Sequence, residues 1–501
     1  MAMALQALQI FFTPSMLLVC LAGGLAGVIF GAIPGLSGGT CMILALPITY
    51  AMNTNMAVAL LTSIWVGGTS GSFIGSILLG IPGSVASIAT VYDGYEFTRQ
   101  GDPVRALSAG TVANFLGTVP SLLIAMFSCQ IIAKYAVKLG AWEYFALGFC
   151  AITLVITLSK GNMIKGLIGA ALGLLLSAVG TAPICGTPRF TFGSYYFSGG
   201  FSLVCVMMGI FAGRIIIMEY AKGEKLGDES AQNKIKVGGF HLPFTDVIKN
   251  IKNIFVSFFI GLWIGFLPGM GAALSNVVAY AVAKSSSKHP EKFGKGCIDG
   301  VFAPEVANNA SIGGALIPAI ALGIPGDTAT ALMLGGLVIH GVESGPLMFR
   351  NQPVMVYCIF VAAIFGAIFV LMGEVFGMKA LPMLLTVPYH YLYPAIVVLC
   401  FAGVYISSGN IFAVFASIFF TLLGIWMQFA GIPNSPFTLA FVLSTILETY
   451  FRRALSYSGI GTFFTRPISC VLIVFSLATV FWPIIRNRFF AKTFEQVEDD
   501  D

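Results

Sequence analysis

The order of apolar and polar residues predicts long hydrophobic helices with few charges between them. No Asp, Glu, Lys, Arg or His occurs from Met1 to Tyr92, and only His390 interrupts the stretch from Ala380 to Leu447. Further uncharged runs cover 106–133, 166–188, 190–213, 253–283, 351–373 and 467–485. Because about 20 apolar residues span the hydrocarbon core of a bilayer, we expect an all-α polytopic integral membrane protein with about 10 to 13 membrane segments.

Composition supports a protein that has lipid as its main solvent. Charged residues make up 9% of the chain, whereas soluble domains carry about 25%. The net charge of +5 is a sign of membrane orientation, because basic residues collect in cytoplasmic loops, and it does not indicate nucleic acid as a partner. The 10 cysteines show no CxxC spacing, so we expect small apolar residues and neither a disulfide framework nor a metal site.

One long polar stretch divides the chain into two hydrophobic halves. It contains six lysines between positions 219 and 252, which favours a cytoplasmic connector. We therefore expect four parts: a first membrane repeat with following helices (1–218), the connector (219–252), a second membrane repeat with following helices (253–485) and a C-terminal tail (486–501).

Two motifs occur once in each half and indicate an internal repeat. The sequence GVIFGAIPGL at 27–36 returns as GLWIGFLPGM at 261–270, an offset of 234 residues. The sequence LLGIPGS at 78–84 returns as ALGIPGD at 321–327, an offset of 243 residues. The second copy therefore has about nine additional residues, and the loop from Lys284 to Lys295 is the simplest place for them.

The charges around the second copy predict how it lies in the membrane. Lysines flank the uncharged run 253–283 at both ends, and Pro268-Gly269 interrupts it. Both ends are thus expected in the cytoplasm, which predicts a re-entrant helical hairpin with its tip near Pro268. Arg99 and Arg105 then place the first copy in the opposite orientation, so the repeats are expected to be inverted. One observation opposes this scheme, because Lys134 and Lys138 fall in a loop that it places outside.

Four Pro-Gly breaks at equivalent positions of the two halves predict the binding site. Unpaired backbone groups in hydrocarbon cost several kcal/mol, so broken helices survive only where protein or a water-filled cavity receives them. Free N–H groups at half-helix N-termini suit a carboxylate, and unwound carbonyls suit Na⁺. The breaks could instead be kinks or close-packing glycines, which are ordinary in membrane helices.

Two sets of residues follow from these breaks. The expected substrate-binding residues are Pro34, Gly35, Ser37, Gly38, Gly39, Thr40, Pro268, Gly269, Gly271, Ser275 and Asn276. The expected ion-binding or substrate-binding residues are Pro82, Gly83, Ser84, Glu305, Asn308, Asn309, Ser311, Pro325, Gly326, Asp327 and Thr328. Neither set requires a buried cation for an anionic substrate.

Glu305, Asn308 and Ser311 follow one another at intervals of three residues, so a helix would place them on one face. That face could supply oxygens for Na⁺ or donors for a substrate. It could equally be an interfacial helix start in which Glu305 is a first-turn carboxylate. Glu374 borders an apolar run and is expected at the membrane interface.

Enzymatic alternatives have little support in the sequence. GTSG at 68–71 matches the form found around the nucleophile of rhomboid proteases, and Tyr92-Asp93 matches one half of an intramembrane aspartyl protease site. The first needs a histidine base in the membrane. The second needs a partner Gly-x-Gly-Asp, whereas this chain has IPGD at 324–327. We therefore expect no enzyme and no cofactor.

The chain resembles the large membrane subunit of the tripartite tricarboxylate transporters, the TctA family, over nearly its whole length. The motifs are GAIPGLSGG at 31–39, GGTSGSFIGSILLGIPG at 67–83, DGYEFTRQG at 93–101, RFTFG at 189–193, GFLPGMG at 265–271, FGKGCIDGVFAPEVANNASIGG at 293–314 and ALGIPGD at 321–327. Glu96-Phe97 and the segment 182–185 depart from the family pattern, which affects the expected substrate more than the family.

The resemblance implies a secondary transporter of the bacterial inner membrane that imports carboxylates such as citrate by alternating access. Na⁺ is the coupling ion that it implies. It also implies two partners, a small four-helix membrane subunit (TctB-like) and a periplasmic solute-binding protein (TctC-like). The RFTFG stretch could be a docking surface for them or simply an ordered loop. A channel, or a membrane scaffold for partner subunits, is the alternative function.

Overall fold

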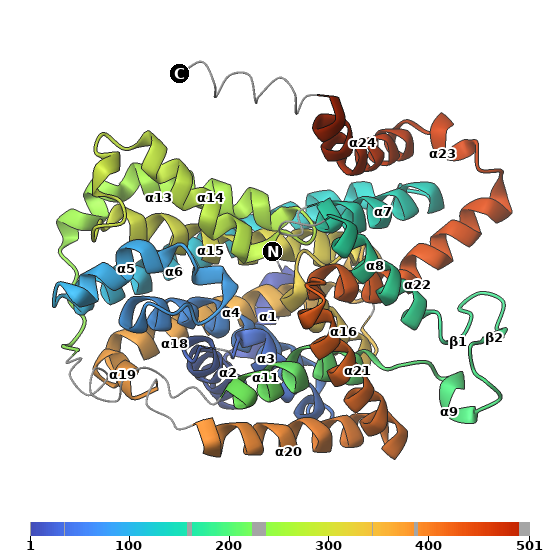
Figure 1. The fold of residues 1–501 in the computed structure, drawn as a ribbon, viewed down its shortest axis with the longest axis horizontal. Helices are drawn as coiled ribbons and strands as arrows, with labels where there is room; N and C mark the ends of the chain where they lie inside the picture. The colour runs from blue at the N-terminus through green and yellow to red at the C-terminus, as the bar shows by residue number, and fades with distance from the viewer. Residues whose placement is uncertain are drawn as a thin grey trace. The chain divides into compact units, whose positions relative to one another are not determined.

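The computed structural model describes residues 2–34, 36–157, 163–222, 237–342, 344–384 and 389–489. Helices make up nearly all of this part of the chain, and its only strands form one short antiparallel pair (Figure 1). The described chain forms two compact units, of which the first contains Met1–Val137 and Ser202–Trp426 and the second Lys138–Phe201 and Met427–Asp501. The expected all-α architecture is confirmed.

The first unit contains most of the helices. Its N-terminal elements are α1 (Ala2–Phe11), α2 (Pro14–Ala32), α3 (Gly38–Thr49), α4 (Thr54–Leu79), η1 (Val85–Ser87), α5 (Thr90–Arg99) and α6 (Pro103–Ala136). After the second unit's first segment follow α10 (Leu203–Met207), the π-helix η2 (Met208–Gly213), α11 (Arg214–Lys222), α13 (Phe244–Phe266), α14 (Gly271–Ser286), η3 (Pro290–Lys292), α15 (Asp299–Leu322), α16 (Thr328–Ile339), α17 (Met348–Asn351), α18 (Pro353–Gly377), η4 (Met378–Ala380), α19 (Leu381–Leu384), α20 (Tyr389–Ser408) and α21 (Ile411–Phe429), whose last residues belong to the second unit.

The second unit combines two separate segments of the chain. Its elements are α7 (Ala141–Thr157), α8 (Met163–Ser177), β1 (Gly180–Thr181), β2 (Pro188–Arg189), α9 (Tyr195–Ser198), α22 (Asn434–Tyr457), α23 (Thr462–Thr465) and α24 (Pro467–Phe489). Helix α22 packs against α7 and α8, and α24 packs against α7. The Arg466 guanidinium lies 2.7 Å from the Glu143 carboxylate and stacks over the Trp142 ring, which joins α24 to α7 at their ends.

Six helices in the described residues are long and apolar enough to cross a membrane by length and composition. They are Pro14–Ala32, Thr54–Leu79, Pro103–Ala136, Phe244–Phe266, Pro353–Leu384 and Ile411–Phe429. Several shorter apolar helices accompany them. A polytopic membrane protein is therefore confirmed, while the number of membrane segments and the inversion of the repeats stay predictions.

Helices α4 and α15 form the centre of the first unit. Almost every residue in the middle of both helices is buried, including small polar ones such as Ser63 and Ser70. Helix α2 packs along α4, while α13, α14 and α6 pack along α15, and Figure 1 shows α13 and α14 side by side next to α15. The two central helices end alike, because Gly80 (φ 69°) and Gly323 (φ 74°) take the left-handed conformation that stops a helix.

The internal repeat is present in the packing of these helices. A Cβ atom added to Gly27 or Gly31 of α2 would collide with the backbone of α4 at Ile64 and Gly68. The equivalent Gly261 and Gly265 of α13 face α15 at Ala307 and Ser311 in the same way. Ile64 and Gly68 precede Ala307 and Ser311 by 243 positions, the offset of the second motif pair. Each copy therefore contains the same close crossing of a hairpin helix and a central helix.

The two units are defined by packing, and each combines segments from both halves of the chain. The boundaries expected from the repeat stay a prediction. Part of the expected connector, 223–236, lies outside the described residues. Helix α13 begins at Phe244, so Lys249 and Lys252 belong to its first turns.

Candidate substrate and ion site

All four expected breaks interrupt helices of the first unit. Helix α2 ends at Ala32 before α3 begins at Gly38, and α4 ends at Leu79 before η1. In the second copy α13 ends at Phe266 before α14, and α15 ends at Leu322 before α16. Helices α13 and α14 also pack on each other, so the chain around Pro268 is the tip of a helical hairpin. Whether this hairpin is re-entrant stays a prediction.

The structure brings the breaks of the second copy together. The Gly269 N–H donates to the Gly326 carbonyl at 2.6 Å. At Gly271 (φ 52°) an added Cβ would lie 2.9 Å from the Cβ atom of Asp327. The hairpin tip between α13 and α14 therefore contacts the break between α15 and α16, and only glycine permits both the conformation and the close approach.

The breaks of the first copy also contact the central helices. An added Cβ at Gly38 would collide with Gly68 in the middle of α4, and one at Gly83 would collide with the Gly31 carbonyl. Helix α3 packs on α16, and Gly39 faces Leu332 of α16. The tip between α2 and α3 thus lies beside the helix that begins at the Asp327 break.

Three helices begin at these breaks with capped first turns. Ser37 accepts from the Thr40 N–H at 3.1 Å, Ser84 accepts from the Ala86 N–H at 3.2 Å, and Asp327 accepts from the Thr330 N–H at 2.8 Å. A cap satisfies one of the free N–H groups of a helix, and the others stay available. Ser37, Gly39 and Thr328 are partly exposed, so these N-termini can offer N–H groups to an anion.

The remaining expected residues are placed as follows. Pro34, Gly38, Thr40, Gly83, Gly271, Ser275, Asn276, Pro325 and Gly326 are buried, while Pro82, Ser84, Pro268, Gly269 and Asp327 are partly exposed. Ser275 donates to the Ala272 carbonyl of its own helix. Gly35 lies outside the described residues.

Asn309 is the centre of a buried hydrogen-bond network between α15, α4 and α6. Its Oδ1 accepts from the hydroxyls of Ser70 at 2.8 Å and Thr118 at 3.2 Å, and its Nδ2 donates to Asn114 Oδ1 at 2.6 Å. Asn114 in turn donates to the Ser70 carbonyl at 2.9 Å. Asn309 Nδ2 also donates to the Glu305 carbonyl of its own helix at 3.1 Å. The network connects the two copies through buried polar groups that satisfy one another.

Glu305, one turn before Asn309 on α15, is linked to Asn276 of α14 through Thr90. The Thr90 hydroxyl donates to Glu305 Oε1, and the Asn276 amide donates to the Thr90 oxygen at 3.4 Å. Asn276 Oδ1 accepts from the Ala89 N–H at 2.8 Å. Glu305 Oε2 has no hydrogen-bond partner, so this carboxylate retains an oxygen for a ligand or a proton.

Glu305, Asn308 and Ser311 all lie in α15, so the helix on which the expected common face depends is present, and all three are buried. The alternative of an interfacial helix start is wrong, because α15 begins at Asp299 and Glu305 lies in its second turn. Asn308 Nδ2 reaches the Thr69 carbonyl of α4 at 3.5 Å, and its Oδ1 has no partner. Thr69 is partly exposed within an otherwise buried part of α4.

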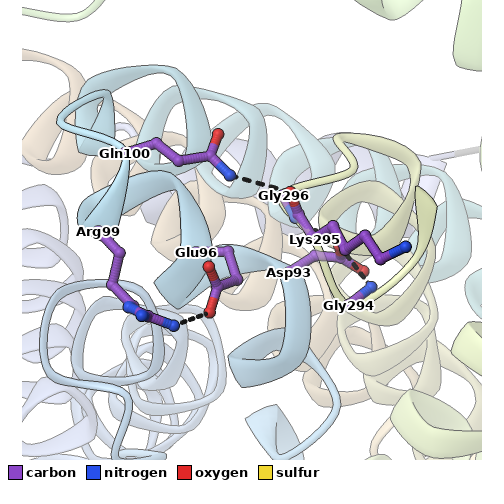
Figure 2. A network of polar contacts seen from close by, with 7 residues as sticks. All are labelled: Asp93, Glu96, Arg99, Gln100, Gly294, Lys295 and Gly296. Carbon is purple, nitrogen blue, oxygen red and sulfur yellow. Dashed lines mark hydrogen bonds and ion pairs between the residues drawn. The ribbon is translucent and has the colours of Figure 1, made fainter.

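A second polar junction between the copies involves Asp93 of α5 (Figure 2). Its Oδ1 accepts from the N–H groups of Gly294, Gly296 and Cys297 at 2.7–3.0 Å, and its Oδ2 accepts from the Tyr280 hydroxyl at 2.8 Å. Gln100 donates to the Lys295 carbonyl at 2.9 Å, and Arg99 pairs with Glu96 within α5. Asp93 therefore holds the loop before α15 without any cation, through charge-assisted bonds.

Sequence reasoning missed several residues of these networks. Asn114 and Thr118 belong to no repeated motif, but with Thr111 and Ser121 they recur at intervals of three or four residues within an apolar run. Glu374 was expected at the interface, which is wrong, because it is 1% exposed and faces Thr111 and Asn114 of α6. For α6 this stripe of polar residues at helical spacing was the available signal, since buried polar groups in membrane helices point inward to partners.

The chemistry available is that of oxygens and backbone N–H groups. No group of three or more His, Cys, Asp or Glu side chains in the described residues could hold a metal ion. Amide, hydroxyl and carboxylate oxygens of the kind gathered at α4 and α15 suit a hard cation. The helix N-termini at the breaks suit a carboxylate.

Comparison with known proteins identifies relatives over most of the chain. The family described as "Tripartite tricarboxylate transporter TctA family" matches residues 17–439. An Agrobacterium vitis protein, "Uncharacterized 52.8 kDa protein in TAR-I ttuC' 3'region", is 33% identical over 484 residues, which are 95% of each chain. A second, "Uncharacterized protein in TAR-II ttuC' 3'region", is 35% identical over 242 residues, 48% of this chain and 100% of its own length. No solved structure matches.

Proposed function

The chain belongs to the tripartite tricarboxylate transporter TctA family, and from this membership we propose that it imports carboxylates as the large membrane subunit of a three-part transporter. The family is a transporter family, and the chain is a multi-pass membrane protein. We propose the bacterial inner membrane as its location. The proposed partners are a small membrane subunit and a periplasmic solute-binding protein.

The observation that carries this proposal is the gathering of the broken helices around one buried polar centre. The two hairpins pack on α4 and α15 at repeat-equivalent glycines, and the free helix N-termini lie beside the Asn308 and Glu305 face. Paired broken helices in a repeat are the usual frame of a substrate site in secondary transporters. Positive helix ends with no buried cation fit an anionic substrate.

We propose that the N-termini of α3 and α14 hold the carboxylate groups and that Na⁺ is the coupling ion. Movement of the hairpins and central helices as one body would expose the site to each side in turn, which is alternating access. The close backbone contacts at Gly31, Gly265 and Gly314 support movement as a body, because tightly interlocked helices do not slide easily.

The RFTFG stretch at 189–193 is our candidate for docking the solute-binding protein. Phe192 is 85% exposed and Tyr195 is 88% exposed. Phe190 (φ 50°) and Phe192 (φ 49°) have left-handed backbone conformations, which bulky residues rarely adopt. Strained conformations of this kind cluster at functional sites.

Uptake into reconstituted vesicles tests the proposal. The complex with both partners should accumulate citrate against its gradient when Na⁺ is supplied outside. Without the solute-binding protein or without Na⁺, accumulation should be lost. A channel would instead equilibrate citrate without saturation and without the binding protein, and that result would contradict the proposed function.

A substitution at Gly39 tests the assignment of the anion site. An added Cβ at this partly exposed residue has no neighbour closer than 3.5 Å, so Gly39→Ala should leave uptake near its normal rate. Gly39→Asp places a negative charge at the N-terminus of α3 and should raise the KM for citrate about tenfold or more. Equal uptake by the two variants would place the carboxylate elsewhere.

A further inference from the structure

A small cavity lies in the first unit where α4, α6 and α18 pack together. Its volume is about 10 Å³, the space of roughly one water molecule. The polar lining comes from Ser70, Thr111, Asn114, Thr118 and Glu374, and the rest is apolar. None of the four expected helix breaks lines it, so it is distinct from the proposed anion site.

Three oxygens in the cavity wall have no hydrogen bond. They are both carboxylate oxygens of Glu374 and the hydroxyl oxygen of Thr111. Glu374 is 1% exposed, and no basic side chain of the described residues forms an ion pair with it. No Lys, Arg or His is among the residues that line the cavity. A buried carboxylate in this setting needs either a positive partner or a proton.

The other polar groups in the wall have already used hydrogens on one another. The hydroxyls of Ser70 and Thr118 both donate to Asn309 Oδ1, and Asn114 Nδ2 donates to the Ser70 carbonyl. Their oxygens keep lone pairs, since a hydroxyl oxygen has two. Apart from the Thr111 hydroxyl, the wall therefore presents mainly oxygens with unused lone pairs, which disfavours an anion and favours a cation.

We propose that this cavity binds one Na⁺, with Glu374 and Thr111 as its principal ligands and the Ser70, Asn114 and Thr118 oxygens completing the shell. Na⁺ is a hard cation that takes oxygen ligands, as carboxylates, hydroxyls and amides supply. A proton on Glu374 would neutralise the charge but would leave most of the surrounding acceptors without a donor. A single compact cation satisfies the carboxylate and the neutral oxygens together.

The site is connected to the α4–α15 crossing through shared residues. Ser70, Asn114 and Thr118 contact both the cavity and Asn309. Asn308 directly precedes Asn309 along α15, and Glu305 lies one turn earlier. Bound Na⁺ would order this network and so the face beside the broken helices. That role in coupling rests on the proposed function, whereas binding itself rests only on the contacts described here.

Thermal unfolding of the purified full-length protein in detergent tests binding without transport. At fixed pH and ionic strength, replacing K⁺ by Na⁺ should raise the unfolding midpoint by about 2 °C or more. Glu374→Gln removes the charge and should abolish the Na⁺ response. Thr111→Val should weaken it, and Thr111→Ser, which keeps the hydroxyl, should preserve it. Thr62→Val is the matched control. Thr62 lies on α4, and its hydroxyl is also buried and unpaired, but it does not line the cavity.

Several results would overturn the proposal. An Na⁺ response that persists in Glu374→Gln and in Thr111→Val would place the cation elsewhere. A midpoint that ignores Na⁺ but rises on acidification, and loses this rise in Glu374→Gln, would show that Glu374 carries a proton. If Glu374→Gln fails to fold, radioactive Na⁺ binding to Thr111→Val and Thr111→Ser decides, and equal binding contradicts the assignment. Na⁺ binding without Na⁺-dependent citrate uptake would support the site and contradict only the proposed coupling.

Discussion

The two copies of the repeat share their backbone contacts but differ in polar side chains. Gly71 meets the Val28 carbonyl and the equivalent Gly314 meets the Leu262 carbonyl. At the neighbouring turn, however, Glu305, Asn308 and Asn309 of α15 stand where α4 has Thr62, Trp65 and Val66. The close helix contacts are therefore duplicated, while the set of polar side chains Glu305, Asn308 and Asn309 is present only in the second copy. One polar face at the crossing fits a single site between the two copies better than one site in each.

The breaks after α4 and α15 also share their backbone arrangement and differ in a polar side chain. Ser84 and Asp327 are equivalent caps, and the hydroxyls of Ser87 and Thr330 donate to the carbonyls of these caps at 3.2 and 2.9 Å. The local hydrogen-bond pattern is thus preserved, but only the second copy has a carboxylate there. A serine satisfies the helix start and an aspartate adds charge, which changes what the helix end can attract.

The largest expected effect concerns the orientation of the two repeats. If the repeats are inverted, equivalent loops lie on opposite sides of the membrane. Ala51, just after α3, and Ser285, in the last turn of α14, are equivalent and exposed. The background variant is Cys185→Ser, because Cys185 is the one exposed native cysteine. In this background we expect Ala51→Cys to react with an impermeant maleimide only from the periplasm. Ser285→Cys should react only from the cytoplasm. Labelling of both from the same side would contradict the inversion, and mass spectrometry of the labelled protein measures it.

Removing the polar centre of α15 should have the next largest effect. Asn309→Ala leaves the Ser70 and Thr118 hydroxyls and the Asn114 carbonyl without their partner, which should cost about 3 kcal/mol. Val66→Ala at the equivalent position of α4 opens a comparable space but leaves no polar group unpaired. The difference between their thermal unfolding midpoints measures the polar contribution, and equal losses would contradict a network that is specific to the second copy.

The shared backbone contacts predict matched losses in the two copies. Gly31→Ala and Gly265→Ala each add a methyl group against the backbone of a central helix, and overpacking of this kind should cost about 2 kcal/mol in each variant. Gly377→Ala on α18 is the control, because its added Cβ meets no neighbouring atom. Unfolding midpoints should fall equally for the first two and stay unchanged for the control; a loss in one copy alone would show that the frames are not equivalent.

The sequence predicted the features that depend only on residues close together along the chain. Proline and glycine at the breaks interrupt any helix, and the recurrence of Gly27 and Gly31 as Gly261 and Gly265 revealed the repeat. That these glycines form the close helix crossings follows from the structure. The spacing of Glu305 and Asn308 fixed their common face. In each case the local backbone requirement is the physical cause, so no knowledge of neighbouring helices was needed.

The rest depends on which helices pack together. Asn114 and Glu374 belong to α6 and α18, which lie outside the repeat, and their neighbours come from other helices. Glu374 follows an apolar run that ends at Gly373, so it has the pattern of an interfacial residue. Its burial follows from the packing of α18 against α4 and α6, which periodicity along one helix does not encode.

The smallest expected effect concerns the caps that differ between the copies. Asp327→Ser copies the first repeat into the second and keeps a hydroxyl acceptor for the Thr330 N–H, so stability should fall by less than about 1 kcal/mol. Asp327→Ala removes the cap and should cost about 1 kcal/mol. If the carboxylate serves only as a cap, the serine variant should transport normally. A serine variant of near-normal stability that loses citrate uptake or its Na⁺ dependence would instead show that the charge itself is required, because the cap is retained and only the charge is gone.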